Sequence, residues 1–233
     1  MKRLAILGST GSIGQSTLAV AAEHPEEFSV VSLAAGKNVA LLAEQIKRFK
    51  PALVSVQDEA AAVQLRELVG ANPAPEILSG RAGALAVATA PGAELVVSAM
   101  VGAVGLEPTL AAIRAHLPVA LANKETLVAA GPLVMALAQE CGVPLLPVDS
   151  EHSAIFQALQ GQRRADVRRL WLTASGGPFR SWEAKRLAAA PKRADRPGHP
   201  ARALPKAGSC PAWRRARDRH CSSARETRVV PSP

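Results

Sequence analysis

Short apolar runs alternate along the chain with longer, Ala-rich amphipathic stretches. The runs are rich in Val, Ile and Leu and predict strands at Arg3–Leu7, Ser29–Leu33, Leu53–Val56, Leu95–Ser98, Val119–Leu121 and Leu145–Val148. The stretches between them predict helices at Ile13–Ala22, Val39–Lys47, Glu59–Leu68, Gly105–Ala115, Glu125–Ala130, Pro132–Glu140 and Ser153–Leu159. This alternation is typical of an α/β fold with a parallel sheet and helices on both faces.

The pattern changes in the last part of the chain. A further strand is predicted at Arg168–Thr173, and periodicity stops beyond Ala190. The whole chain carries a formal charge of +9, of which residues 191–233 carry +8. The same segment contains seven of the 18 Pro and no Ile, Phe or Met. A segment of this composition buries too little apolar surface to fold, so we expect a disordered basic tail.

Composition also limits the partners and the compartment. Residues 1–190 are nearly neutral, so we expect no nucleic-acid partner. The alternative is a tail in which Trp213 stacks on a base while Arg214, Arg215 and Arg217 contact phosphates. The apolar runs are far shorter than the ~20 residues that a membrane span needs. Three cysteines without a framework pattern indicate a reducing, cytoplasmic location.

A glycine-rich loop follows the first predicted strand directly. It reads Gly8-Ser-Thr-Gly11-Ser-Ile-Gly14 and leads into a predicted helix. Glycines allow a tight turn and a close backbone approach, and the free N–H groups at a helix N-terminus attract a pyrophosphate. The spacing is GxxGxxG and not GxGxxG, and a plain strand-to-helix turn is the alternative. Because the loop lies between a strand and a helix, the sequence favours a Rossmann-like, nucleotide-binding domain.

The end of the second predicted strand bears on which nucleotide binds. NAD-specific sites usually place an Asp or Glu there to accept from the ribose 2′-OH. The chain instead reads Ala34-Ala35-Gly36-Lys37-Asn38, with no carboxylate. Lys37 offers a positive charge where the 2′-phosphate of NADP(H) would lie, although a solvated loop lysine is the alternative. The sequence therefore favours NADP(H) over NAD.

Polar residues also follow two later strands, in Asn123-Lys124-Glu125 and Asp149-Ser150-Glu151-His152. Strand ends of a parallel sheet open on the side where ligands bind. If Asp149–Glu151 continues extended, both carboxylates point the same way and offer two hard oxygen ligands to Mg²⁺ or Mn²⁺. Alternatively, Asp149 or Ser150 only caps the next helix.

Taken together, these strings resemble one enzyme family. The segments Gly8–Gly14, Ala35–Asn38, Ala122–Glu125, Pro147–Gln157 and Leu172–Arg180 are similar, in order, to 1-deoxy-D-xylulose 5-phosphate reductoisomerase. The resemblance runs to about Arg186, and the string PVDSEHSAIFQ is its most specific part. It implies the NADPH- and metal-dependent rearrangement and reduction of 1-deoxy-D-xylulose 5-phosphate to 2-C-methyl-D-erythritol 4-phosphate, in non-mevalonate isoprenoid biosynthesis.

The resemblance also implies a role for each cluster. Residues that would hold NADPH are Thr10, Gly11, Ser12, Ile13, Gly36, Lys37, Asn38, Asn123 and Glu125. Asp149 and Glu151 would bind Mg²⁺ or Mn²⁺. Lys124, Ser150, Glu151 and Ser175 would contact the phosphorylated sugar substrate, and Lys124, Asp149 and Glu151 would be the catalytic groups. A homodimer is expected from the family.

The expected organisation has three parts. Residues 1–146 form the NADPH-binding domain, 147–190 begin an incomplete α+β catalytic domain, and 191–233 form the tail. The family's later strings, which carry a third metal carboxylate and phosphate-binding residues, do not occur after Arg186. One hypothesis is an out-of-frame tail, which sequencing of the coding region would test. We therefore expect impaired activity, and the alternative function is a catalytically inactive NADPH-binding fragment.

Overall fold

The computed structural model describes residues 1–70, 74–170, 173–174 and 230–231. The chain divides into two compact units, Met1–Ser153 and Ala154–Pro233. The first unit contains a seven-stranded parallel sheet and the helices around it, and the residues expected to bind cofactor and metal all lie within it.

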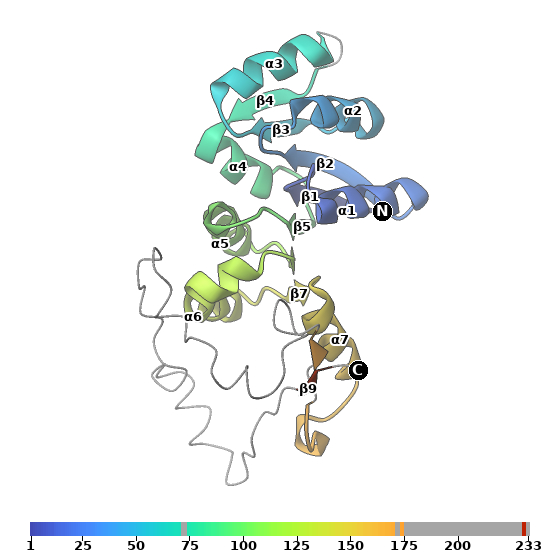
Figure 1. Cartoon of the computed structure of the whole chain (residues 1–233), viewed down its shortest axis with the longest axis vertical. Coiled ribbons are helices and arrows are strands. Elements are labelled where there is room, and N and C mark those ends of the chain that lie inside the picture. Colours follow the sequence, from blue (N-terminus) through green and yellow to red (C-terminus); the bar gives the residue numbers. More distant parts are fainter. Residues whose placement is uncertain (71–73, 171–172, 175–229, 232–233) are drawn as a thin grey trace, which may run out of the picture. The chain divides into compact units, whose positions relative to one another are not determined.

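Strands and helices alternate through the first unit (Figure 1). The strands are β1 (Lys2–Leu7), β2 (Phe28–Ala34), β3 (Leu53–Val56), β4 (Glu76–Ser79), β5 (Leu95–Ser98), β6 (Val119–Leu121) and β7 (Leu145–Pro147). The helices are α1 (Ser12–Glu23), α2 (Val39–Phe49), α3 (Glu59–Val69), α4 (Gly80–Ala88), α5 (Leu106–Arg114) and α6 (Lys124–Glu140), with a 3₁₀ turn, η1 (Ala103–Gly105), before α5. A further helix, α7 (Ser150–Ala158), begins in the first unit and ends in the second.

The sheet has the order β4-β3-β2-β1-β5-β6-β7, and every pairing is parallel. The chain winds outward from β1 in one direction through β2, β3 and β4, and then returns to the other side of β1 with β5. The strand order therefore reverses between β1 and β5. In open α/β sheets the crevice at the carboxyl ends of such strands is where ligands bind.

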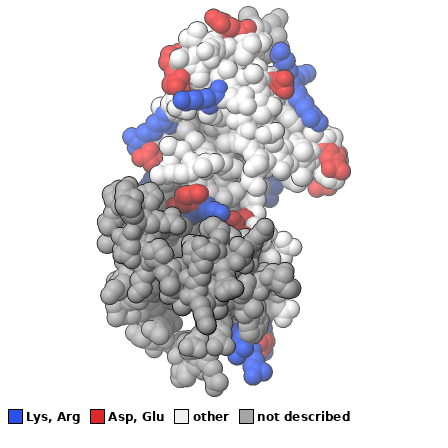
Figure 2. Space-filling view, in the orientation of Figure 1, with Lys and Arg blue, Asp and Glu red and all other residues white. Residues whose placement is uncertain are grey.

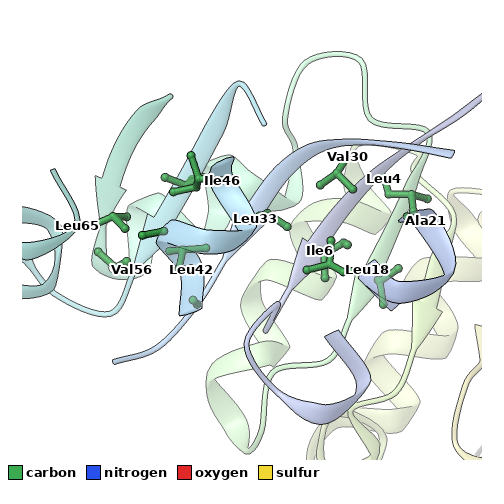
Figure 3. Close-up of a cluster of buried hydrophobic side chains, with 14 of the residues drawn as sticks. Leu4, Ile6, Leu18, Ala21, Val30, Leu33, Leu42, Ile46, Val56 and Leu65 are labelled. Carbon is green, nitrogen blue, oxygen red and sulfur yellow. The ribbon is translucent and has the colours of Figure 1, made fainter. Parts of the chain in front are cut away.

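Each face of the sheet is covered by three helices, because side chains along a strand alternate between its faces. Ile6 packs with Leu18 of α1, as Figure 3 shows, and Leu42 and Leu65 extend the same core beneath α2 and α3. On the opposite face, buried residues of β1, β5 and β6 pack against α4, α5 and α6. The predicted α/β class and Rossmann-like, two-sided sheet are thus confirmed.

Most predicted elements occur within two or three residues of their expected bounds. The prediction missed β4 and α4, which follow one another at residues 76–88. β4 is an edge strand with only two apolar residues, and α4 starts at Gly80 without a side-chain cap, so neither carries a strong signal. The expected break before Pro132 occurs as a kink at Ala130, whose φ and ψ are −142° and 27°.

The second unit is described only in part. It contains a 3₁₀ turn at Arg164–Asp166 and a two-stranded parallel sheet of β8 (Thr173–Ala174) and β9 (Val230–Pro231). Residues 168–170, predicted as a strand, have no regular structure, and the strand is confined to β8 within the described residues. The expected catalytic-domain segment beyond residue 174 and the expected disordered tail lie outside the described residues, apart from β9.

The core beneath α3 predicts a clear stability contrast. Leu65 is fully buried and Leu68, on the same helix, is 47% exposed. Leu65→Ala is expected to lower the free energy of unfolding by about 2–5 kcal/mol, because it removes buried methyl groups and leaves a cavity. Leu68→Ala is the matched control and should change it by less than about 0.5 kcal/mol. Urea unfolding followed by circular dichroism measures both, and equal losses would contradict the packing described.

Candidate functional site

The carboxyl ends of the central strands meet at one edge of the sheet. The register pairs Leu7 of β1 with Ala34 of β2 and with Ser98 of β5. Beyond the strands, backbone bonds continue this alignment: Ala99 N–H donates to the carbonyl of Leu7 at 2.9 Å. The loops that leave β1, β2 and β5 therefore start side by side, around the place where the strand order reverses.

The loop after β1 requires its first glycine. Gly8 has a φ of +87°, a region that favours glycine. A Cβ built there would lie 2.6 Å from the carbonyl oxygen of Ala99, so a side chain would push β1 and β5 apart. Gly14 is equally constrained, because its Cβ would overlap the carbonyl oxygen of Gly8 and lie 2.6 Å from Ser9 Cα. These two glycines let the backbone fold tightly under the start of α1.

The start of α1 is open to a ligand. Gly11, Ser12 and Ile13 are exposed, and Thr10 is half-buried. Gly11 precedes the first helical residue with an extended backbone, and no acidic residue lies in the first turn of the helix. The first N–H groups of a helix have no partner within it, and its dipole favours an anion. The expected cofactor residues after β1 therefore surround a potential pyrophosphate site.

The loop after β2 carries the second expected cluster. Gly36 and Lys37 are exposed, and Asn38 caps α2 by accepting the N–H of Leu41 at 3.2 Å. The start of this loop is fixed to the neighbouring strand, because Ala35 N–H donates to the carbonyl of Ser55 in β3 at 2.9 Å. Lys37 thus extends from a fixed backbone into solvent next to the glycine loop's strand.

Asn123 follows β6 and is only 3% exposed. Its side-chain oxygen accepts the N–H of Thr126 and caps α6, and its Nδ2 donates to the carbonyl of Gly102 at 3.0 Å. Asn123 therefore ties the start of α6 to the loop after β5. Glu125 is exposed in the first turn of α6. The side chain of Asn123 is already bonded within the protein, whereas Glu125 faces solvent.

The three expected catalytic residues, Lys124, Asp149 and Glu151, come together after β6 and β7, and His152 lies beside them. Lys124 Nζ lies 3.8 Å from Asp149 Oδ2, and His152 Nδ1 lies 3.8 Å from Asp149 Oδ1. Asp149 is 20% exposed, whereas Lys124 is 65% exposed. Of the two alternatives for Asp149–Glu151, the structure has the helix start and not the extended run: α7 begins at Ser150, and Ser153 N–H donates to the Asp149 carbonyl. The strand end and the first helical turn, not a strand's alternation, bring the two carboxylates together.

The surroundings of Glu151 favour its charged form. The Ser150 hydroxyl donates to Glu151 Oε2 at 2.6 Å and is the main cause that lowers the pKa of Glu151. The backbone N–H of Glu151, a side-chain contact with Asp149 and the charge of Lys124 lower this pKa further. A carboxylate pair beside a lysine is a suitable set of hard oxygen donors for a divalent cation.

Ser175, expected to contact substrate, lies outside the described residues. Gln45 of α2, which sequence reasoning missed, is 6% exposed and donates to the carbonyl of Ser9 at 2.9 Å. Its signal was present in the sequence, since it is a polar residue between Leu42 and Ile46 on the apolar face of an amphipathic helix.

Lysine, arginine and acidic side chains are interspersed over the coloured part of the face in Figure 2, without a continuous basic patch. Within the part of the chain that the structure describes, no helix has the length and apolar character of a membrane-spanning segment.

These features define a class: an α/β protein with a dinucleotide-type loop at the switch point of its sheet and an acidic pair nearby. Comparisons with known proteins then identify the family. A profile described as 1-deoxy-D-xylulose 5-phosphate reductoisomerase matches residues 4–131, and one for the C-terminal domain of the same enzyme matches residues 145–207. The chain belongs to the 1-deoxy-D-xylulose 5-phosphate reductoisomerase family.

Individual relatives agree with this assignment. The chain is 60% identical over 187 residues to the 1-deoxy-D-xylulose 5-phosphate reductoisomerase of Prosthecochloris aestuarii, covering 80% of this chain and 49% of the relative. The Zymomonas mobilis enzyme, solved in complex with NADPH, superposes with a TM-score of 0.74 at 41% identity. The matched region covers 80% of this chain and 49% of the Zymomonas mobilis chain. A DOX-P reductoisomerase solved with NADPH, fosmidomycin and magnesium gives a TM-score of 0.72 at 39% identity, covering 82% of this chain and 49% of its own.

The chain therefore spans about half the length of the relatives it matches. The second profile match ends at residue 207, beyond the boundary expected at residue 190.

The bond between Ser150 and Glu151 predicts a measurable titration change. Ser150→Ala is expected to raise the pKa of Glu151 toward its ordinary value, because it removes the main cause of the depression. Lys124→Met should raise the pKa less, since the charge of Lys124 is the weakest cause that lowers it. A carboxyl group with a depressed pKa stabilises the fold above its unfolded pKa, and this contribution is lost as the pH falls through the folded pKa.

Titration of the Glu151 side-chain carboxyl carbon by NMR measures both variants against the parent chain. A larger rise in Lys124→Met than in Ser150→Ala would contradict the assigned cause.

Proposed function

We propose that this chain provides the NADPH-binding site and two metal carboxylates of a 1-deoxy-D-xylulose 5-phosphate reductoisomerase. The reaction is the rearrangement and reduction of 1-deoxy-D-xylulose 5-phosphate to 2-C-methyl-D-erythritol 4-phosphate, in non-mevalonate isoprenoid biosynthesis. Family membership supports the reaction, and one observation in the structure carries the proposal. The exposed glycine loop, Lys37 and the Lys124–Asp149 pair all follow strands of one sheet at their carboxyl ends.

The residues at the first two strand ends fit NADPH. Gly8 and Gly14 leave no room for side chains, so the backbone can approach a pyrophosphate at the start of α1. We assign the pyrophosphate to Thr10, Gly11, Ser12 and Ile13, and the adenosine 2′-phosphate to Gly36, Lys37 and Asn38. Asn38 would contribute through its backbone or through Nδ2, because its side-chain oxygen caps α2.

We place the nicotinamide half near Asn123 and Glu125. Asn123 would act mainly by fixing the loop after β5, because both ends of its amide are bonded within the protein. Glu125, exposed on the first turn of α6, can accept a hydrogen bond from a ligand directly.

The donor set of Asp149 and Glu151 fits Mg²⁺ or Mn²⁺. Both are hard oxygen ligands, and the lowered pKa of Glu151 favours the charged form that a metal requires. When bound, the cation supplies Lewis acidity to the substrate's carbonyl and adjacent hydroxyl oxygens, and NADPH supplies the hydride. Lys124, 3.8 Å from Asp149 and largely exposed, would stabilise negative charge on the substrate oxygen that changes protonation.

Ser150 and Ser175 are further proposed substrate contacts. The Ser150 hydroxyl donates to Glu151, so it would orient that carboxylate and bind substrate from the same position.

A second candidate function is a catalytically inactive NADPH-binding fragment. Hard divalent cations prefer about six oxygen ligands. The part of this site that the structure describes offers two carboxylates, Asp149 and Glu151, whereas the nucleotide loops are formed entirely within the first compact unit. This contrast favours nucleotide binding that is retained more fully than catalysis.

We propose residues 1–146 as the NADPH-binding domain, 147–190 as the start of the catalytic domain and 191–233 as a separate tail. The partners proposed are a phosphorylated sugar and a second copy of the chain, with no nucleic-acid or membrane partner and a cytoplasmic location.

Nucleotide preference provides the first test. The chain is expected to bind NADPH more tightly than NADH, because Lys37 can pair with the 2′-phosphate. Lys37→Asp should reverse the preference, with a loss of about 1.5–3 kcal/mol of charge-assisted hydrogen bonding to NADPH. Calorimetric titration of both nucleotides measures the affinities.

Lys47→Asp is the matched control for this test. Lys47 is exposed in the last turn of α2, the helix that follows Lys37. Its substitution makes the same change in net charge, but away from the loop that carries Lys37. Equal affinities for the two nucleotides in the parent chain, or equal effects of the two substitutions, would overturn the role of Lys37.

Turnover provides the second test. The chain is expected to oxidise NADPH with 1-deoxy-D-xylulose 5-phosphate and Mn²⁺ more than about tenfold, or ~1.4 kcal/mol, more slowly than a full-length relative. The reason is an incomplete set of oxygen ligands and of contacts that hold the substrate in a reactive geometry. Absorbance at about 340 nm, the reduced-nicotinamide band, follows the reaction. Turnover within tenfold of the relative would exclude the inactive-fragment function.

A further inference from the structure

We infer that Gln45 is a positioning residue for dinucleotide binding, which holds the glycine loop in its binding conformation through the carbonyl of Ser9. This inference rests on the proposed NADPH function and assigns a role to a residue that would not itself touch the cofactor. Its basis is a buried contact between α2 and the loop after β1.

The contact lies in the protein interior. Gln45 is 6% exposed, Ser9 is fully buried, and Gln45 Nε2 donates to the Ser9 carbonyl at 2.9 Å. A buried glutamine on the apolar face of a helix carries a desolvation cost that a leucine or methionine would avoid. The hydrogen bond to Ser9 offsets this cost and fixes the amide at one orientation.

The bond completes the anchoring of the Ser9 peptide. Ser9 N–H donates to the carbonyl of Ala34 at the end of β2, at 2.9 Å, and Gly8 N–H donates to the same oxygen at 2.8 Å. β2 therefore fixes the N–H side of Ser9, and α2 fixes its carbonyl through Gln45. The residues that follow lead into α1: Gly11 N–H donates back to the carbonyl of Gly8 at 3.1 Å, and the backbone N–H groups of Ser12 and Ile13 would face the pyrophosphate.

The same helix connects the two halves of the proposed cofactor site. α2 begins next to Lys37 and Asn38, where the 2′-phosphate would bind, and Gln45 lies about two turns further along. A rigid helix therefore sets the distance between the 2′-phosphate site and the pyrophosphate loop. Loss of the Gln45 bond would leave the first site intact and release only the second.

Each of the two residues has a second buried polar atom beside those in this bond. Ser9 Oγ and Gln45 Oε1 are buried without a hydrogen-bond partner. Buried polar atoms of this kind are usually satisfied by an ordered water with two or more protein partners.

The experiment compares ligands that use different parts of the site. NADP⁺ requires both the 2′-phosphate site and the loop, whereas adenosine 2′-monophosphate has no 5′-phosphate and requires only the first. Gln45→Met keeps the size and helix propensity of the side chain but removes the donor to Ser9. It is expected to weaken NADP⁺ binding by about tenfold or more and to leave adenosine 2′-monophosphate within about twofold.

Ile46→Val is the matched control, since Ile46 is buried in the same helix and packs into the hydrophobic core beneath it. It should leave the affinity for both ligands unchanged, although it also alters the core. Calorimetry or competition binding on the full chain gives the affinities, and circular dichroism at the same temperature verifies that each variant is folded.

Gln45→Glu adds a pH profile that a purely structural role would not produce. A charged carboxylate facing the Ser9 carbonyl would repel it, whereas a protonated carboxyl would donate to it as the amide does. NADP⁺ affinity relative to the parent chain should therefore recover as the pH falls, and the ratio for Ile46→Val should stay flat. This variant also provides the test if Gln45→Met does not fold.

The outcomes separate the two proposals. Parent chain that does not bind NADP⁺ would overturn the proposed function and the inference with it. Parent chain that binds, with Gln45→Met binding both ligands as the parent does or weakened equally for both, would overturn the positioning role alone. Selective loss of NADP⁺ binding together with the pH recovery in Gln45→Glu supports it.

Discussion

The close approach of β1 to its neighbours at Gly8 is the constraint on which the rest of the site depends. The carbonyl of Ala34 accepts two successive N–H groups, from Gly8 and Ser9, so the chain turns immediately after the last residue of β1. The same turn lies against Ala99 of β5 so closely that a Cβ at Gly8 cannot fit. Because β1 is the central strand of the sheet, this packing sets the position of the start of α1 relative to both halves of the sheet.

The polar groups of the candidate site fall into two kinds with different physical roles. Asn38, Asn123 and Gln45 are bonded to the protein's own backbone and hold loops in place. Lys37, Lys124 and Glu125 are exposed and available to a ligand. A site built this way keeps its exposed, charged groups on backbone that is already fixed, which reduces the ordering cost of binding.

Sequence patterns predicted the α/β class and six of the seven strands in the main sheet. They also predicted which polar segments lie at the carboxyl edge of that sheet. They could do so because buried strands such as β3 and β5 are short apolar runs, and Gly8, Lys37 and Asp149 lie one to three residues after strand ends. β4 was missed because an edge strand is half exposed and needs few apolar residues. The sequence left two geometries open for Asp149 and Glu151, because the start of α7 depends on tertiary context. Gln45 was missed because its partner is 36 residues away.

The strand order has a consequence for how the domain assembles. β1 to β4 pair only with strands adjacent in the sequence, and so do β5 to β7, with one exception: β1 pairs with β5. That pairing must enclose all of the chain between Leu7 and Leu95, so it carries the largest loop-closure entropy in the sheet. Each half of the sheet can therefore form through short-range contacts before the two halves join. The crevice at the switch point lies between these two halves, so it is complete only when β1 and β5 pair.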